Sequence, residues 1–293
     1  MVAHGRFEAG TLAAAIAART ESALALGALL PIPTHARVIR ERGIPFAVRV
    51  LEQLARKQAA RVGQQASGTN PFLPYDEELW VADLSDTHVC LLNKFNVVEH
   101  HVLLVTRAFE DQEEPLCPAD FAALWACLEE TSGLCFYNAG QAAGASQRHK
   151  HLQAVPLPLG PGDGFPLAGR LGALAPTRGV AVPDGLPFPV ALASLEALGS
   201  RHPDEAAQTL EALYREMLER TGVVPGRTAY NLLATRRWLW LVPRSQAEWQ
   251  GISVNALGFA GALIVPDEAA FARLRAHGPL ALLRAVTPGG EPV

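Results

Sequence analysis

The stretch Gly144-Ala145-Ser146-Gln147-Arg148-His149-Lys150-His151-Leu152-Gln153 has polar side chains at every second position near its end. Alternate side chains of a β-strand share one face, so we expect His149, His151 and Gln153 to form one row. Lys150 would point away from the row, and Leu152 would point into the core. The same pattern is also compatible with a solvated strand face, or with a metal site built on the two histidines.

The segment before this row is rich in small residues. Residues 138–146 include Gly140 and Gly144, so backbone N–H groups there could approach an anionic phosphate closely. Ser146 and Gln147 would add side-chain donors. A tight turn is the alternative interpretation of the segment.

Apolar patterns on either side predict an α+β fold with an antiparallel sheet flanked by α-helices. Short turns between neighbouring strand-like runs favour antiparallel pairing, and stretches with helical periodicity separate them. The predicted strands lie at residues 79–84, 88–93, 102–106, 134–137, 149–153, 230–235, 238–242 and 258–265. The predicted helices lie at residues 11–29, 118–133 and 204–221, with one more at the end of the chain. Residues 61–70 are predicted to form a polar loop, and the Pro- and Gly-rich residues 156–189 a long irregular connection.

The bulk composition indicates a folded protein and excludes some function classes. The chain has 293 residues, of which 49% are hydrophobic and 18% charged, enough for a sizeable core. We expect one domain over residues 1–293, with a C-terminal subregion from about residue 190 as an alternative division. A net charge of -4 argues against a general nucleic-acid binder, because binding to the phosphate backbone needs a basic excess.

The cysteines and the N-terminus predict the compartment. Four cysteines occur without a C-x-x-C pair, so we expect reduced, mostly buried thiols and no zinc ribbon. The apolar stretch after Thr11 is interrupted by Arg19 and Glu21, too early for a secretory signal or a membrane span. These features predict a cytoplasmic protein without membrane contact.

Several blocks of the chain together resemble one known family: the diadenosine tetraphosphate phosphorylases, also called ATP adenylyltransferases, of the histidine-triad superfamily. They belong to its galactose-1-phosphate uridylyltransferase-like branch. The resemblance spans most of the chain. Its blocks are Asn70-Pro71-Phe72-Leu73-Pro74, Asn93-Lys94-Phe95-Asn96-Val97-Val98 with His101 and residues 103–106 behind it, residues 144–153, Tyr230-Asn231-Leu232-Leu233, Val242-Pro243-Arg244 and residues 253–260.

The resemblance implies phosphorolysis of diadenosine tetraphosphate to ADP and ATP. His151 would attack the α-phosphorus and form a nucleotidyl-histidine, which inorganic phosphate then resolves. His149 would help to position the site, and Gln153 would hydrogen-bond the phosphoryl oxygens. Hydrolases of the superfamily commonly carry a third histidine at the last position of the row, so Gln153 favours transfer.

The resemblance also implies a set of substrate-binding residues. Asn93, Lys94 and Asn96 would contact the nucleotide or its phosphates, although a hairpin turn is the alternative reading of their block. The loop residues Asn138, Gly144, Ser146 and Gln147 would bind phosphate.

The family pattern is followed only loosely at two further positions. Lys57 would correspond to a lysine that reaches the phosphates, although the residues around it match loosely. Glu99 stands where family members often carry proline, and its carboxylate would have to face away from the phosphates.

The expected cofactor is a divalent cation, Mg²⁺ first, brought by the substrate phosphates, with no protein metal site and no organic cofactor. The expected partners are a dinucleoside polyphosphate, ATP, ADP and phosphate, and the oligomeric state is not predicted. One alternative is a related transferase with another base or acceptor, such as a sugar phosphate or sulfate. A non-catalytic nucleotide-binding protein is the other.

Overall fold

The computed structural model describes residues 8–52, 70–199 and 201–290. Lys57 and almost all of the predicted polar loop at residues 61–70 lie outside the described residues. In the described ranges, no helix is both long and apolar enough to cross a bilayer.

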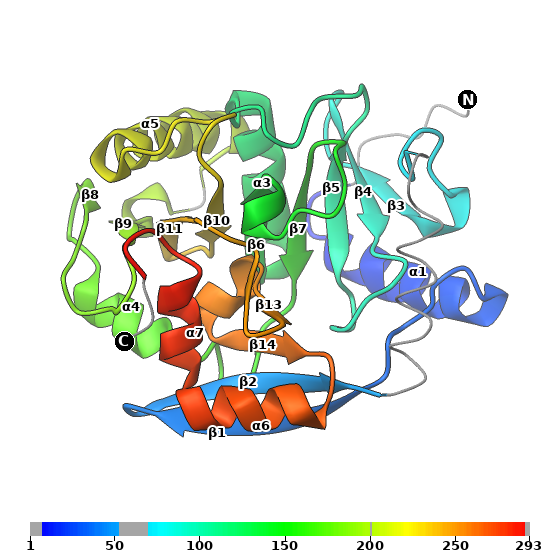
Figure 1. Ribbon diagram of the computed structural model, residues 1–293. Helices are drawn as coiled ribbons and strands as arrows, with labels where there is room; N and C mark the ends of the chain where they lie inside the picture. The colour runs from blue at the N-terminus through cyan, green and yellow to red at the C-terminus, as the bar shows by residue number, and fades with distance from the viewer. Residues whose placement is uncertain (1–7, 53–69, 200, 291–293) are drawn as a thin grey trace.

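A nine-stranded sheet runs across the molecule (Figure 1). Its strand order is β3-β4-β5-β7-β6-β10-β11-β9-β8, and all of its neighbouring strands pair antiparallel. This sheet confirms the predicted α+β class. Its strands are β3 (Trp80–Asp83), β4 (His88–Leu92), β5 (Val102–Thr106), β6 (Leu134–Ala139), β7 (His151–Val155), β8 (Val180–Ala181), β9 (Ala191–Ser194), β10 (Tyr230–Ala234) and β11 (Trp238–Pro243).

Three helices cover one face of this sheet: α1 (Leu12–Leu26), α3 (Pro118–Thr131) and α5 (Pro203–Thr221). Their apolar stripes bury Trp125 and Tyr214 against the strands. The predicted end of the first helix at residue 29 is wrong. The helix ends at Leu26 because Gly27 adopts a left-handed φ of 71° and donates its N–H to the last carbonyls.

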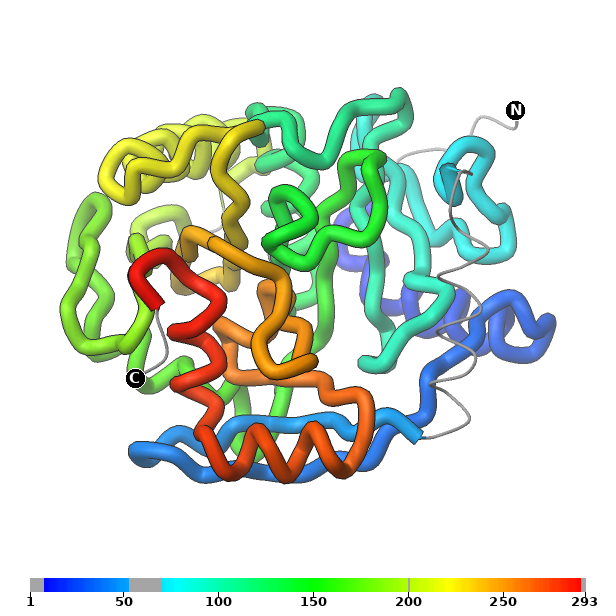
Figure 2. Tube along the Cα trace, in the orientation of Figure 1, coloured from blue at the N-terminus to red at the C-terminus, as the bar shows by residue number. Residues whose placement is uncertain are grey.

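A second layer covers half of the opposite face. It contains the hairpin β1 (Thr34–Glu41) and β2 (Ile44–Leu51), with β14 (Ala262–Val265) parallel to β2. The helices α4 (Ala168–Leu174), α6 (Glu268–His277) and α7 (Pro279–Ala285) complete it. In Figure 2 the blue N-terminal hairpin and the red C-terminal helices lie side by side. This layer packs on Phe136 and Trp240 of the large sheet.

The rest of that face has a thinner cover. Val89, Leu91, Leu103 and Val105 project from β4 and β5 and pack with Phe72, which comes from the segment before β3. The register places Val105 opposite His151 and Leu103 opposite Gln153. The polar row of β7 therefore lies on this face, beside the edge of the second layer.

Three further predicted boundaries are wrong. The strand at 258–265 is confined to β14, because residues 256–260 form the 3₁₀ turn η4 (Ala256–Ala260), which ends at Gly261 with φ 93°. The connection at 156–189 is not wholly irregular, since it contains α4 and β8. β6 extends to Ala139, so Asn138 lies in a strand and not in the following loop.

The remaining short elements join these layers. They are η1 (Glu77–Leu79), η2 (Gln141–Ala143), η3 (Glu196–Leu198) and the hairpin β12 (Glu248–Trp249) and β13 (Ile252–Ser253).

Candidate active site

The polar row lies on one face, as the alternation predicts, although β7 begins at His151 and not at His149. The ring of Phe72 lies 5.6 Å from the ring of His149 and 5.3 Å from that of His151. His149 precedes the strand and is held by an isolated bridge to Asp111. Both imidazoles are almost fully buried, with 2% and 5% of their surface exposed.

The hydrogen bonds of His151 determine its tautomer. Its Nδ1 lies 2.8 Å from the carbonyl oxygen of His149, and because a carbonyl only accepts, Nδ1 carries the proton. Nε2 then keeps its lone pair, and no described residue hydrogen-bonds to it. Burial lowers the pKa of His151 to about 4, so the ring is neutral near pH 7. A neutral imidazole with a free Nε2 can act as a nucleophile.

His149 has both ring nitrogens engaged. Its Nε2 donates to the carbonyl oxygen of Thr106 at 2.7 Å, and its Nδ1 accepts from Nδ2 of Asn70 at 2.9 Å. Burial lowers the pKa of His149 as well. His149 therefore has no free ring nitrogen that could act as a nucleophile or a base. Its backbone carbonyl instead accepts the proton of His151 Nδ1 and so fixes the tautomer of His151.

The orientation of Gln153 is set by a two-step relay. Nδ2 of Asn93 donates to Nδ1 of His101 at 3.1 Å, so the proton of His101 sits on Nε2. That Nε2 donates to Oε1 of Gln153 at 3.0 Å. Burial lowers the pKa of His101 to about 4, which keeps this donor and acceptor pattern at neutral pH. The amide NH₂ of Gln153 is thus left to face a ligand.

The side chains of Lys94 and Asn96 contact residues outside the row. This block connects β4 to β5, as the hairpin reading predicts, and Asn93 N–H bonds the carbonyl of His101. Nζ of Lys94 lies 3.4 Å from a carboxylate oxygen of Asp76 in an exposed pair. Asn96 is buried, and its Oδ1 has no partner among the described residues. Glu99 is exposed, and its Oε1 lies 3.8 Å from Nε2 of His100.

Asn138 belongs to a buried amide network. Its Oδ1 accepts from Nδ2 of Asn231 at 2.9 Å and from the backbone N–H of Ala256 at 3.0 Å. Arg244 donates in turn to Oδ1 of Asn231 at 2.6 Å. Two donors on Oδ1 fix the amide of Asn138, leaving its Nδ2 as the remaining donor. β6 and β7 are antiparallel neighbours, so this group shares the face of His151.

The loop between β6 and β7 is compact. Gly144 has φ 92°, and a Cβ there would lie 3.1 Å from the backbone of Asn255, so only glycine fits this contact with the second layer. Ser146 is exposed and Gln147 is partly exposed. A cavity of about 420 Å³ opens at this end of the sheet beside Ala139 and Gly140, but His151 does not line it.

Comparison with known proteins assigns the family. The model of the Ap4A phosphorylase N-terminal domain matches residues 3–171, and that of the ATP adenylyltransferase C-terminal domain matches residues 184–288. The chain belongs to the Ap4A phosphorylase family. It is therefore a nucleotidyltransferase.

Individual members of the Ap4A phosphorylase family are similar over most of the chain. Diadenosine 5',5'''-P1,P4-tetraphosphate phosphorylase 2 of Saccharomyces cerevisiae is 31% identical over 243 residues, covering 73% of this chain and 74% of the relative. Protein APA1 of the same yeast is 26% identical and covers 90% and 89%. The crystal structure of the yeast Ap4A phosphorylase Apa2 in complex with AMP is 25% identical. It superimposes with a TM-score of 0.76, covering 97% of this chain and 100% of that chain.

In this Ap4A phosphorylase family member, some residues that contact the row are not predicted from the sequence. The buried side chain of Gln112 accepts from the N–H of His151 at 2.8 Å and donates to the carbonyl of Asn138 at 3.0 Å. The backbone pairing of β6 with β7 ends at Phe136 and Gln153. Beyond that point the side chain of Gln112 bridges the two strands in place of backbone hydrogen bonds. Thr106 and Gln112 lie outside the row, and no spacing along the chain connects them to it. Asn70 lies in one block of the family resemblance, but the resemblance implies no role for it.

Proposed function

We propose that this protein catalyses phosphorolysis of diadenosine tetraphosphate to ADP and ATP through an AMP–histidine intermediate on His151. In the first step Nε2 attacks the α-phosphorus, a P–N bond forms, and the P–O bond to ATP breaks. In the second step an oxygen of inorganic phosphate attacks the same phosphorus, the P–N bond breaks, and ADP leaves. The observation that carries this proposal is the neutral His151, whose Nδ1 is bonded and whose Nε2 is free.

The neighbouring residues fit the stabilisation of a phosphoryl group. Because His101 holds Oε1 of Gln153, the amide NH₂ of Gln153 remains available as a donor. It can donate to a non-bridging oxygen of the phosphoryl group. Nδ2 of Asn138 offers a second fixed donor from the adjacent strand. Donors held in place before reaction stabilise developing charge without reorganisation.

The remaining substrate contacts are assigned by position. Gly144, Ser146 and Gln147 precede the nucleophile in the loop. We propose that the backbone N–H groups and side chains of Ser146 and Gln147 bind phosphate. The N–H of Gly144 donates to the carbonyl of Gln141 at 2.9 Å, and we propose that this glycine lets the phosphate approach the loop closely. Lys94, whose ammonium is partly exposed, is proposed to contact the polyphosphate. Asn93 and Asn96, from the same block, are proposed to contact the nucleotide or its phosphates. Lys57 is proposed for the same role, outside the described residues.

We propose that a divalent cation, Mg²⁺ first, arrives with the polyphosphate. No group of three or more His, Cys, Asp or Glu side chains within residues 8–52, 70–199 and 201–290 could hold a metal ion. Phosphate oxygens are the ligands that Mg²⁺ takes in such sites, with water completing its shell. In this proposal the ion binds together with the substrate phosphates.

A cytoplasmic location is proposed from the thiols. Cys90, Cys117, Cys127 and Cys135 are all free, and three of them are buried. Free thiols are typical of a reducing compartment.

The deciding assay incubates the protein with diadenosine tetraphosphate and Mg²⁺, with and without inorganic phosphate. We expect ADP and repeated turnover to ATP only when phosphate is present. Without phosphate we expect an AMP adduct in the intact mass and no more than one ATP released per protein molecule. His151→Ala should lose both signals while nucleotide affinity stays within about tenfold, or 1.4 kcal/mol. Equal turnover to AMP and ATP without phosphate would show hydrolysis, and a faster reaction with another nucleoside donor would change the substrate.

A further inference from the structure

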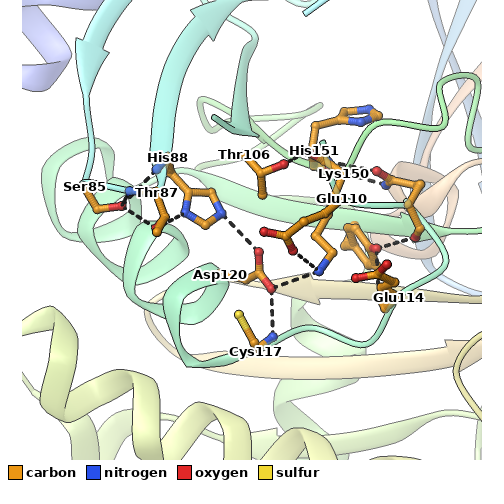
Figure 3. Close-up of polar contacts among 12 residues, drawn as sticks. Ser85, Thr87, His88, Thr106, Glu110, Glu114, Cys117, Asp120, Lys150 and His151 are labelled. Atoms are coloured by element: carbon orange, nitrogen blue, oxygen red, sulfur yellow. Dashed lines mark hydrogen bonds and ion pairs between the residues drawn. The ribbon is translucent and has the colours of Figure 1, made fainter. Parts of the chain in front are cut away.

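Lys150 lies between the two histidines of the row and points to the other side of the strand (Figure 3). Only 2% of its surface is exposed. Its Nζ lies 2.7 Å from Oε2 of Glu110 and 3.7 Å from Oδ2 of Asp120, and it donates to the carbonyl of Pro115 at 3.3 Å. The nucleophile and this ammonium are therefore one residue apart, on opposite faces.

The surroundings of the ammonium are fixed by the core. Asp120 is fully buried at the start of α3, and its carboxylate accepts from the N–H of Cys117 at 2.8 Å and pairs with Nε2 of His88 at 3.0 Å. Burial opposes ionisation of Asp120, but the His88 hydrogen bond and the Lys150 charge lower its pKa below the ordinary value. A buried ion cluster is costly to desolvate and seldom adds net stability, so its placement directly behind a nucleophile calls for a second role.

The backbone geometry indicates that role. The N–H of Lys150 donates to the carbonyl of Glu110 at 2.8 Å, while its side chain binds the carboxylate of the same residue. A trans peptide is planar, with its N–H and C=O pointing in opposite directions. Fixing the N–H of Lys150 on Glu110 therefore aims the carbonyl of His149 the other way. That carbonyl is the group that accepts from Nδ1 of His151.

We infer that the Lys150–Glu110 pair is a positioning device that holds the His149 carbonyl and so keeps the proton of His151 on Nδ1. This inference rests on the proposed function of His151. A free imidazole exchanges between two tautomers, and the tautomer with its proton on Nε2 has no lone pair on that nitrogen with which to attack phosphorus. Lys150 acts through the peptide and touches no reacting atom.

Two variants and one control test the role. Lys150→Met removes the ammonium at similar length, and Glu110→Gln removes the carboxylate charge while keeping an acceptor oxygen. Arg148→Met removes the neighbouring ion pair with Asp111, also 2.7 Å long, whose arginine is 85% exposed. An exposed pair contributes little, so this control should behave as wild type.

The first readout is the tautomer of His151, followed by ¹⁵N NMR on protein with labelled histidine. The second is the single-turnover rate of AMP-adduct formation from diadenosine tetraphosphate, with nucleotide affinity measured in parallel. We expect a mixed tautomer and a 10- to 100-fold slower adduct in Lys150→Met, and a smaller effect of the same sign in Glu110→Gln. Nucleotide affinity should change by less than threefold.

The outcomes separate the inference from the proposed function. If Lys150→Met does not fold, Glu110→Gln decides, because Glu110 is partly exposed and its backbone contact remains. A wild-type tautomer and an adduct rate within twofold of Arg148→Met in the folded variants would overturn the inference. A wild-type protein with the Nδ1–H tautomer but no adduct would instead reject the proposed function.

Discussion

Burial of His151 makes a quantitative prediction about the pH dependence of adduct formation. The perturbation is a change from pH 7.5 to pH 5.5, two units that span the ordinary pKa of histidine. With a pKa of about 4, the neutral fraction of His151 is about 97% at pH 5.5 and nearly complete at pH 7.5. With an ordinary pKa near 6.5 it would fall from about 91% to about 9%. At pH 5.5 the rate of adduct formation expected for a pKa of about 4 is therefore about tenfold higher than the rate expected for an ordinary pKa.

The assay is rapid mixing of excess protein with diadenosine tetraphosphate and saturating Mg²⁺, quenched and analysed by intact mass. The dinucleotide is the right substrate because it has no terminal phosphate monoester, whose second pKa near 6 would add its own pH dependence. Circular dichroism at both pH values must show the same folded fraction. We expect rates within twofold of each other.

A tenfold loss of rate with a midpoint near 6.5 would refute this reasoning. It would mean that the nucleophile is hydrated in the working enzyme, and that the packing of Phe72 against its ring does not persist when substrate binds. A pKa of 5 would still give a loss of only about 1.3-fold, so the test tolerates an error of one unit.

Further predictions concern orientation, stability and the metal ion. His101→Leu frees Oε1 of Gln153, so we expect adduct formation to slow about tenfold, the equivalent of about 1.4 kcal/mol and one hydrogen bond, measured in the same single-turnover assay. The lowered pKa values of His101 and His151 mean that the unfolded chain binds more protons between pH 4 and 6.5. The free energy of unfolding should therefore fall as pH drops through that window, by up to about 3 kcal/mol per histidine in urea titrations. Leu152→Ala, at a fully buried position of β7, should cost about 2 to 5 kcal/mol in the same titrations at pH 7. If the ion arrives with the substrate, as proposed, a chelator should abolish turnover without moving the thermal midpoint of the protein. A lowered midpoint would reveal a metal site on the protein itself.

The sequence predicts those parts of the fold in which the signal is local. α5 has an apolar stripe at helical spacing, and β5 is a run of four apolar residues followed by Thr106, so the sequence predicts both with nearly correct ends. The hairpin of β1 and β2 is not among the predicted elements, although Ile44, Phe46 and Val48 alternate inward along β2. Its partner β1 is largely exposed, and this weakens the pattern expected of a paired strand.

The site divides in the same way. The row of His149, His151 and Gln153 lies within five residues, so strand geometry alone places it on one face. The groups that give each member its role come from distant segments, such as Asn70 and Thr106 for His149. Contacts of this kind are set by strand order, and a single sequence does not reveal strand order.

The continuous sheet has a consequence for fragments of the chain. The two family models meet between residues 171 and 184, yet β6 from the first pairs along its length with β10 from the second, and β2 pairs with β14. Cutting the polypeptide there would leave β6 and β10 as bare edges, each a template for self-association. We expect each half to aggregate when it is expressed alone. When the two halves are expressed together, they should reassemble through the β6–β10 and β2–β14 pairings.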